Sequence, residues 1–152
     1  MYSALRRVPP QRSAEFAIRV GVFDDLLTAA NERAALFTPL PARPAKRLAV
    51  LTCMDARIDP LRIFGLRPGD AAVIRNAGAR IDDSTAAALA IARDMLDVER
   101  VLVLGHTDCR GTEDAAQTVP EDVERAGPQL PGLALGGFVY DVDTGRVSPA
   151  GR

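Results

Sequence analysis

The sequence has no tryptophan, one histidine and two cysteines among its 152 residues. It contains no apolar run near the roughly 20 residues that span a bilayer, so we expect no membrane partner. The formal net charge of −1 gives no electrostatic attraction to nucleic acid or to an anionic membrane surface. Two cysteines do not make a disulfide framework, and in an intracellular chain they indicate a metal site or a reactive thiol.

The composition is that of a soluble globular domain, with 47% apolar and 26% charged residues. The length is sufficient for one domain with its own core. Residues 1–20 carry arginines and Pro9-Pro10 but no apolar signal-peptide segment. We therefore expect a flexible N-terminal extension over residues 1–20, a single domain over 21–152 and a cytoplasmic location.

Apolar runs predict an α/β fold with a small, mostly parallel sheet. The run from Leu48 to Cys53 and the run 101–104 are continuous, which is typical of strands with both faces covered. A shorter strand is expected over 71–75. A helix predicted over 84–96 lies between strands, and a strand–helix–strand order implies a right-handed crossover.

The remaining pattern predicts flanking helices and an edge strand. Residues 22–37 have apolar side chains at helical spacing, which fits a packing helix or an N-terminal arm on a second subunit. Pro60–Phe64 is expected to be a short helix capped by Asp59. The 84–96 helix is expected to be capped by Asp83 or Ser84 and buried all round. We expect residues 110–136 to form a loop with one short helix near 120–126. Residues 138–142 are expected to form an edge strand.

Three loops follow the predicted strands, at 53–57, 75–78 and 105–110, where ligands gather in α/β sheets. The single histidine, His106, and both cysteines, Cys53 and Cys109, lie on two of them. Two thiolates and one imidazole form a ligand set that suits zinc. Taken singly, each residue is more often a buried thiol or a hydrogen-bonded histidine. Their coincidence favours a shared metal site.

Asp55 and Arg57 follow Cys53 at alternate positions, so an extended chain would place all three side chains on one side. Arg57 can hold the Asp55 carboxylate through a bidentate pair. Without it, Asp55 could move onto the metal as a fourth ligand. An ordinary surface ion pair explains the same spacing equally well.

The segments CMDAR at 53–57, RNAG at 75–78 and GHTDC at 105–109 together resemble the β-class carbonic anhydrases, as does GFVYDVDTG at 137–145. The small bacterial members of the class are the most similar. The resemblance implies the fold of that class, zinc as cofactor and reversible hydration of carbon dioxide to bicarbonate and a proton. It also implies a homodimer or a higher homo-oligomer, in which the helix at 22–37 is an arm that embraces the neighbouring subunit.

The resemblance also implies roles for individual residues. Cys53, His106 and Cys109 would be zinc ligands, and Asp55 would alternate between zinc ligand and partner of the attacking water. Arg57 would hold Asp55 off the metal. The loop Asn76-Ala77-Gly78 would line the pocket.

Two departures from the class are visible: Arg110 stands where the class usually has glycine, and the stretch after Cys109 lacks the expected helical material. Other functions also fit these residues. The same site could hydrolyse carbonyl sulfide or carbon disulfide, or hold a structural zinc closed by Asp55. A redox pair of Cys53 and Cys109 without metal is a further alternative.

Overall fold

The structure is a computed structural model that describes residues 20–151, with side chains from residue 21 onwards. The chain divides between Pro39 and Leu40 into two units, which are described separately. The extension predicted over residues 1–20 lies outside the described residues except for its last position. The single domain expected over 21–152 stays a prediction.

The first unit is helical. A 3₁₀ turn η1 (Val20–Phe23), the helix α1 (Asp24–Arg33) and a second 3₁₀ turn η2 (Ala34–Leu36) occupy the segment expected to be one helix. None of the ten residues of α1 is buried. The apolar side chains Phe23, Leu26 and Leu27 are 58%, 63% and 52% exposed, so no residue of this unit covers this side of the helix.

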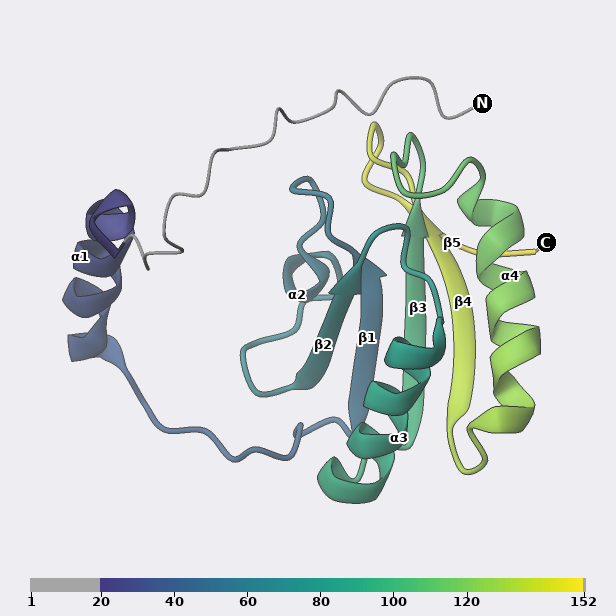
Figure 1. Cartoon of the computed structure of the whole chain (residues 1–152), viewed down its shortest axis with the longest axis horizontal. Helices are drawn as coiled ribbons and strands as arrows, with labels where there is room; N and C mark the ends of the chain where they lie inside the picture. Colours follow the sequence, from purple (N-terminus) through teal and green to yellow (C-terminus); the bar gives the residue numbers. More distant parts are fainter. Residues whose placement is uncertain (1–19, 152) are drawn as a thin grey trace, which may run out of the picture. The chain divides into compact units, whose positions relative to one another are not determined.

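The second unit contains a five-stranded sheet, seen in Figure 1. Its strands are β1 (Leu48–Cys53), β2 (Ala71–Asn76), β3 (Arg100–His106), β4 (Ala134–Tyr140) and β5 (Val147–Pro149). They lie in the order β2-β1-β3-β4-β5. The first four are mutually parallel, and β5 pairs antiparallel with β4. The expected α/β fold with a mostly parallel sheet is confirmed.

The sheet register brings the ends of β1 and β3 together. Thr52 pairs with Leu104, so Cys53 and His106 leave neighbouring parallel strands at the same edge. The Thr52 hydroxyl also donates to the Leu104 carbonyl oxygen at 3.0 Å, deep in the core. This bond ties the two strands together immediately before the residues of the site.

The core lies between one face of the sheet and two helices, α3 (Asp83–Leu96) and α4 (Ala115–Ala126). Side chains of β1 and β3 alternate between faces, as extended strands require. Leu51 and Val103 pack with Leu89 of α3 and Val119 of α4, and all four are almost completely buried. No helix in the described part of the chain has the length and apolar character needed to cross a membrane.

Local chemistry explains the helix ends. The Asp59 carboxylate accepts from the N–H groups of Leu61 and Arg62, which confirms the predicted cap of α2 (Pro60–Ile63). The cap of α3 is Asp82, whose carboxylate accepts from the Thr85 N–H, so the prediction of Asp83 or Ser84 was wrong.

Three further predictions need correction. Helix α3 is not buried all round, because Ile91 and Met95 are exposed. Helix α4 begins at Ala115 and has 12 residues, followed by the turn η3 (Gly127–Gln129), so the region after Cys109 does contain helical material. Pro120 lies inside α4, and proline in a sequence normally argues against a helix interior. Strand β4 begins earlier than expected and pairs on both sides, and the edge strand is β5.

Candidate metal centre

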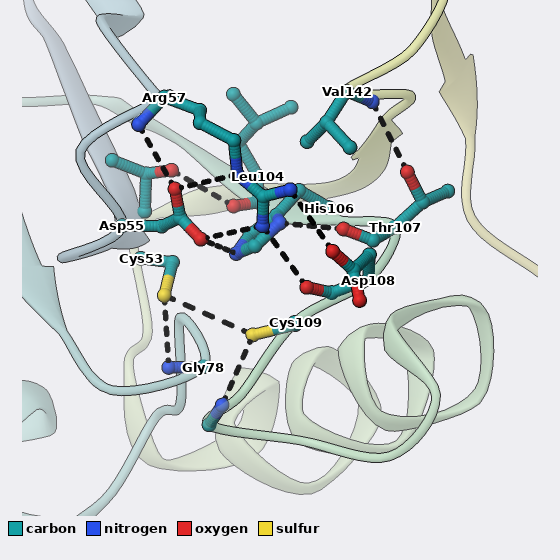
Figure 2. A network of polar contacts seen from close by, with 12 residues as sticks. Cys53, Asp55, Arg57, Gly78, Leu104, His106, Thr107, Asp108, Cys109 and Val142 are labelled. Atoms are coloured by element: carbon teal, nitrogen blue, oxygen red, sulfur yellow. Dashed lines mark hydrogen bonds and ion pairs between the residues drawn. The ribbon is translucent and has the colours of Figure 1, made fainter.

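The structure brings Cys53, His106 and Cys109 into one cluster. Their candidate ligand atoms all lie within 4.8 Å of one another, and within the described residues this is the one group of three such side chains. Cys53 is the last residue of β1 and His106 the last of β3, while Cys109 follows in the adjoining turn. Figure 2 shows the two sulfur atoms facing each other beside the imidazole.

The hydrogen bonds of His106 prepare one ring nitrogen for a ligand. Nδ1 lies 2.8 Å from the Thr107 carbonyl oxygen, and a carbonyl can only accept, so Nδ1 carries the proton. Nε2 therefore presents a lone pair. It is fully buried and has no hydrogen-bond partner, which is unusual for a buried polar atom. A metal ion beside the sulfur atoms would satisfy it.

The two sulfur atoms are spaced for one tetrahedral ion. Sγ of Cys53 and Sγ of Cys109 are 3.8 Å apart, and neither cysteine forms a disulfide. Two sulfurs at the usual Zn–S distance of about 2.3 Å from a tetrahedral zinc are separated by about 3.8 Å. Burial raises the pKa of the Cys109 thiol, and the neighbouring Cys53 adds to this. Two adjacent thiolates therefore require a cation, and the donor set fits zinc.

Two backbone N–H groups support the sulfurs. Gly78 N donates to Cys53 Sγ and Gly111 N donates to Cys109 Sγ, each at 3.3 Å. These loops touch: a Cβ at Gly78, which has φ +82°, would lie 2.8 Å from the Gly111 carbonyl oxygen. A Cβ at Gly111 would lie 2.5 Å from Gly78 N. Only two glycines allow both N–H groups to reach the cluster.

Asp55 and Arg57 form a close pair beside the cluster. Arg57 Nε donates to Asp55 Oδ1 at 3.0 Å and Nη2 donates to Oδ2 at 2.8 Å, and the Arg57 backbone N–H adds a third bond at 2.9 Å. The side-chain bonds, followed by the backbone bond, hold the pKa of Asp55 well below its usual range. Oδ2 of Asp55 lies 3.9 Å from His106 Nε2. The carboxylate is thus ionised, adjacent to the cluster and bound by Arg57.

The segment around Asp55 is anchored by Arg75, the last-but-one residue of β2. Its guanidinium donates to the carbonyl oxygens of Cys53 at 3.0 Å and of Asp55 at 2.8 Å. The sequence prediction did not assign a role to Arg75, although it opens the RNAG segment. Asp108, which contacts Arg57, was also missed, although it lies between two of the predicted ligands.

The predicted pocket loop divides into three roles. Ala77 lines a cavity of about 250 Å³ together with Cys53, Met54, Asp55, Arg110 and Gly111. Gly78 contributes its N–H to Cys53. Asn76 turns away: its side chain bonds the backbone of Arg80 and the Thr85 hydroxyl, which closes the loop on itself.

A buried ion-pair cluster holds the far end of this loop. Asp122 of α4 is 2% exposed, and its carboxylate accepts from Arg80, Arg125 and the Ile81 N–H at 2.7 to 3.0 Å. Burial alone would raise the pKa of Asp122, but the bonds from Arg80 and Arg125 lower it to about 2. Helix α4 therefore fixes the loop that supplies the Gly78 N–H.

Comparison with known proteins agrees with this geometry. A family model described as carbonic anhydrase matches residues 48–131. Beta-carbonic anhydrase 1 of Mycobacterium tuberculosis is 33% identical over 157 residues, covering 84% of this chain and 96% of the relative. A crystal structure of carbonic anhydrase from Streptococcus mutans aligns with a TM-score of 0.78 and 31% identity, over 84% of this chain and 96% of that one.

A relative with another printed activity is also similar. The carbon disulfide hydrolase of Saccharolobus solfataricus is 32% identical over 99 residues, which cover 59% of this chain and 48% of the relative. The match is shorter than the 157-residue match to the Mycobacterium tuberculosis enzyme.

Proposed function

Because this chain belongs to the β-class carbonic anhydrase family, we propose that it is a zinc lyase that reversibly hydrates carbon dioxide to bicarbonate and a proton. The observation that carries the proposal is the convergence of Cys53, His106 and Cys109 on one point. A zinc ion held by these residues would lower the pKa of a water molecule toward about 7 and so supply a nucleophile at neutral pH.

Asp55 orients the attacking water in this proposal. Its carboxylate is ionised and adjacent to His106 Nε2, and an ionised carboxylate can only accept a hydrogen bond. It would therefore accept a hydrogen bond from the water and leave an oxygen lone pair directed at the substrate. Arg57 occupies both carboxylate oxygens, which keeps Asp55 from becoming a metal ligand itself.

The cavity beside Cys53 suits a small uncharged molecule. Met54 and Ala77 contribute apolar surface to the cavity that Asp55 also lines. Carbon dioxide has no hydrogen-bond donor and little polarity, so an apolar wall can hold it next to the water. His106 is the chain's only histidine and is buried as a candidate ligand, so the released proton leaves through water, carboxylates or buffer.

Hydrolysis of carbonyl sulfide or carbon disulfide is the second candidate. The match to a carbon disulfide hydrolase supports it, and both molecules are linear with an electrophilic carbon. The same donor set and Asp55–Arg57 pair would serve either substrate. The longer match to carbonic anhydrases makes carbon dioxide the first choice.

We further propose that the chain forms a homodimer in the cytoplasm. The exposed apolar side of α1 supports the dimer, because an isolated ten-residue helix is marginal in water and its apolar side requires a partner. A second copy of the chain would supply that partner. Two unpaired cysteines that must remain reduced to bind metal support the location.

The decisive experiment measures hydration of carbon dioxide by stopped flow on zinc-loaded full-length protein. We expect a rate above the uncatalysed reaction that rises between about pH 6.5 and 9, since the water must lose a proton. Carbonyl sulfide hydrolysis is measured in parallel. A zinc-loaded protein that hydrates carbon dioxide at no pH would refute the proposal. Cys53→Ala should lose zinc, and full zinc retention would disprove the ligand assignment.

A further inference from the structure

We propose that Asp108 is a positioning residue that fixes the Arg57 guanidinium and thereby keeps the Asp55 carboxylate off the metal position. The inference rests on the proposed function, because it concerns the same Asp55–Arg57 pair. It adds a third member to that pair, contributed by the turn that joins two of the candidate ligands.

The contacts of Arg57 show the arrangement directly. Nη1 donates to Asp108 Oδ2 at 3.0 Å, and Nη2 donates to the Asp108 carbonyl oxygen at 3.0 Å. With the two side-chain bonds to Asp55, Arg57 makes four hydrogen bonds, whereas a guanidinium has five N–H donors. Figure 2 shows Arg57 lying between Asp55 and Asp108.

The bonds between Asp55 and Arg57 are strong but local, because both residues lie on the same short segment. The two residues are two positions apart, and the Arg57 side chain is 43% exposed, so the pair could move together as one mobile unit. The movement needed is small, since Asp55 Oδ2 already lies 3.9 Å from His106 Nε2. A contact from a remote segment ties the guanidinium to the rest of the domain, and Asp108, 51 positions away, supplies one.

The backbone at Asp108 is shaped for this contact. Its φ is +49°, in the left-handed region that aspartate tolerates better than most residues. The conformation directs both its carbonyl oxygen and its carboxylate at Arg57. Because the same turn carries His106 and Cys109, the position of Arg57 is set by the segment that provides the ligands.

The test compares Asp108→Gly with Asp108→Asn in zinc-loaded protein. Glycine adopts φ +49° without strain and keeps the carbonyl bond, so only the carboxylate contact is lost. We expect kcat/KM to fall about tenfold in Asp108→Gly, because a loss of this size is typical of removing a charge-assisted hydrogen bond. The variant should still bind one zinc per chain. Asparagine keeps an acceptor oxygen, so Asp108→Asn should stay within about threefold of wild type. Asp143→Asn, an exposed acid with no contact to Arg57, is the charge control.

A binding measurement separates the positional role from simple charge removal. Thiocyanate is titrated into cobalt-substituted protein and followed by visible absorption. Loss of one negative charge alone would tighten anion binding in both Asp108 variants. If Asp55 moves onto the metal, thiocyanate must displace it, so Asp108→Gly should bind thiocyanate about tenfold more weakly while Asp108→Asn does not.

The outcomes are distinct. Adding Asp108→Gly to Arg57→Ala should not weaken thiocyanate binding any further, because both substitutions act through Asp55. Three results would overturn the proposal: wild-type behaviour of Asp108→Gly in both assays, thiocyanate binding a further tenfold weaker in the double variant than in Arg57→Ala, or loss of zinc from Asp108→Gly. If the wild-type protein does not hydrate carbon dioxide, the proposed function is refuted. The role of Asp108 is then still decided by the thiocyanate titration.

Discussion

Replacing Asp122 by asparagine should lower the free energy of unfolding by about 2 kcal/mol. Asp122 is 2% exposed and accepts four hydrogen bonds from Arg80, Arg125 and the Ile81 N–H. In Asp122→Asn the amide oxygen can keep the pair at Oδ2. The amide N–H₂ then takes the place of Oδ1, which accepts hydrogen bonds from Arg80 and Arg125 in the wild type. Because an N–H₂ group cannot accept, these two charge-assisted bonds are lost.

The magnitude follows from the ionisation of Asp122. Lowering its pKa from 3.8 to about 2 corresponds to about 2 kcal/mol in favour of the carboxylate, and asparagine resembles the protonated acid. Two lost charge-assisted bonds would give about 3 to 6 kcal/mol. The Arg80 and Arg125 side chains are 43% and 51% exposed, so solvent screens them and the lower figure applies.

The assay is urea unfolding of zinc-loaded protein at pH 7, followed by circular dichroism. Because the folded pKa is below the unfolded one, the contribution is complete above about pH 5 and is lost as the pH falls toward about 2. The full difference is therefore present at pH 7. Asp94→Asn, which removes an exposed acid paired with Arg93, is the matched control and should show no measurable change. A loss below about 0.5 kcal/mol in Asp122→Asn would refute the reasoning.

Two other predictions concern Arg57 and α1. Arg57→Ala should keep zinc, because all three candidate ligands remain, but it should lose carbon dioxide hydration because Asp55 is released. Arg62→Ala is the control. An Arg57→Ala variant that still hydrates carbon dioxide would contradict the role assigned to Arg57. Leu26→Glu should shift the full-length chain from dimer to monomer in light scattering at micromolar concentration, because it places a charge on the exposed apolar side of α1. The matched control is Glu32→Gln on the same helix, and an unchanged dimer in Leu26→Glu would exclude this side as the interface.

Strand positions could be predicted from the sequence because buried parallel strands carry continuous apolar runs. The runs ending at Cys53 and after Leu104 are unmistakable, and parallel pairing then places their carboxyl ends at one edge. The sequence prediction made helix α4 too short. Pro120 inside the helix argues against helical structure before it, although Ala115, Val119 and Ala126 fall at helical spacing. Asp114, whose carboxylate accepts from the Ala116 N–H, is the cap that marks the true start.

Long-range side-chain contacts set the limit of sequence reasoning at the site. The candidate ligands are identifiable because sulfur and imidazole are rare in this chain. Arginine and aspartate are common, so no pattern singles out Asp108 for Arg57 or Asp122 for Arg80. Gly111 illustrates the same limit. Arg110 follows Cys109 where the class usually has glycine, so the glycine here, Gly111, stands one position later. Its N–H still reaches the sulfur of Cys109, because the Gly78 loop packs against Gly111.

The charges around the cluster are closely balanced. Two thiolates balance the charge of a zinc ion, so the ligand set is formally neutral. Asp55 and Asp108 add two negative charges, and Arg57 and Arg75, whose guanidinium groups bond to this segment, add two positive charges. Arg110 lines the cavity beside Cys53 and Asp55, so the surroundings carry no negative excess. Local placement of the charges therefore matters more than their sum: the ionised Asp55 carboxylate lies 3.9 Å from His106 Nε2. Under the proposed function, Asp55 at this position would both orient the water and repel an anionic product.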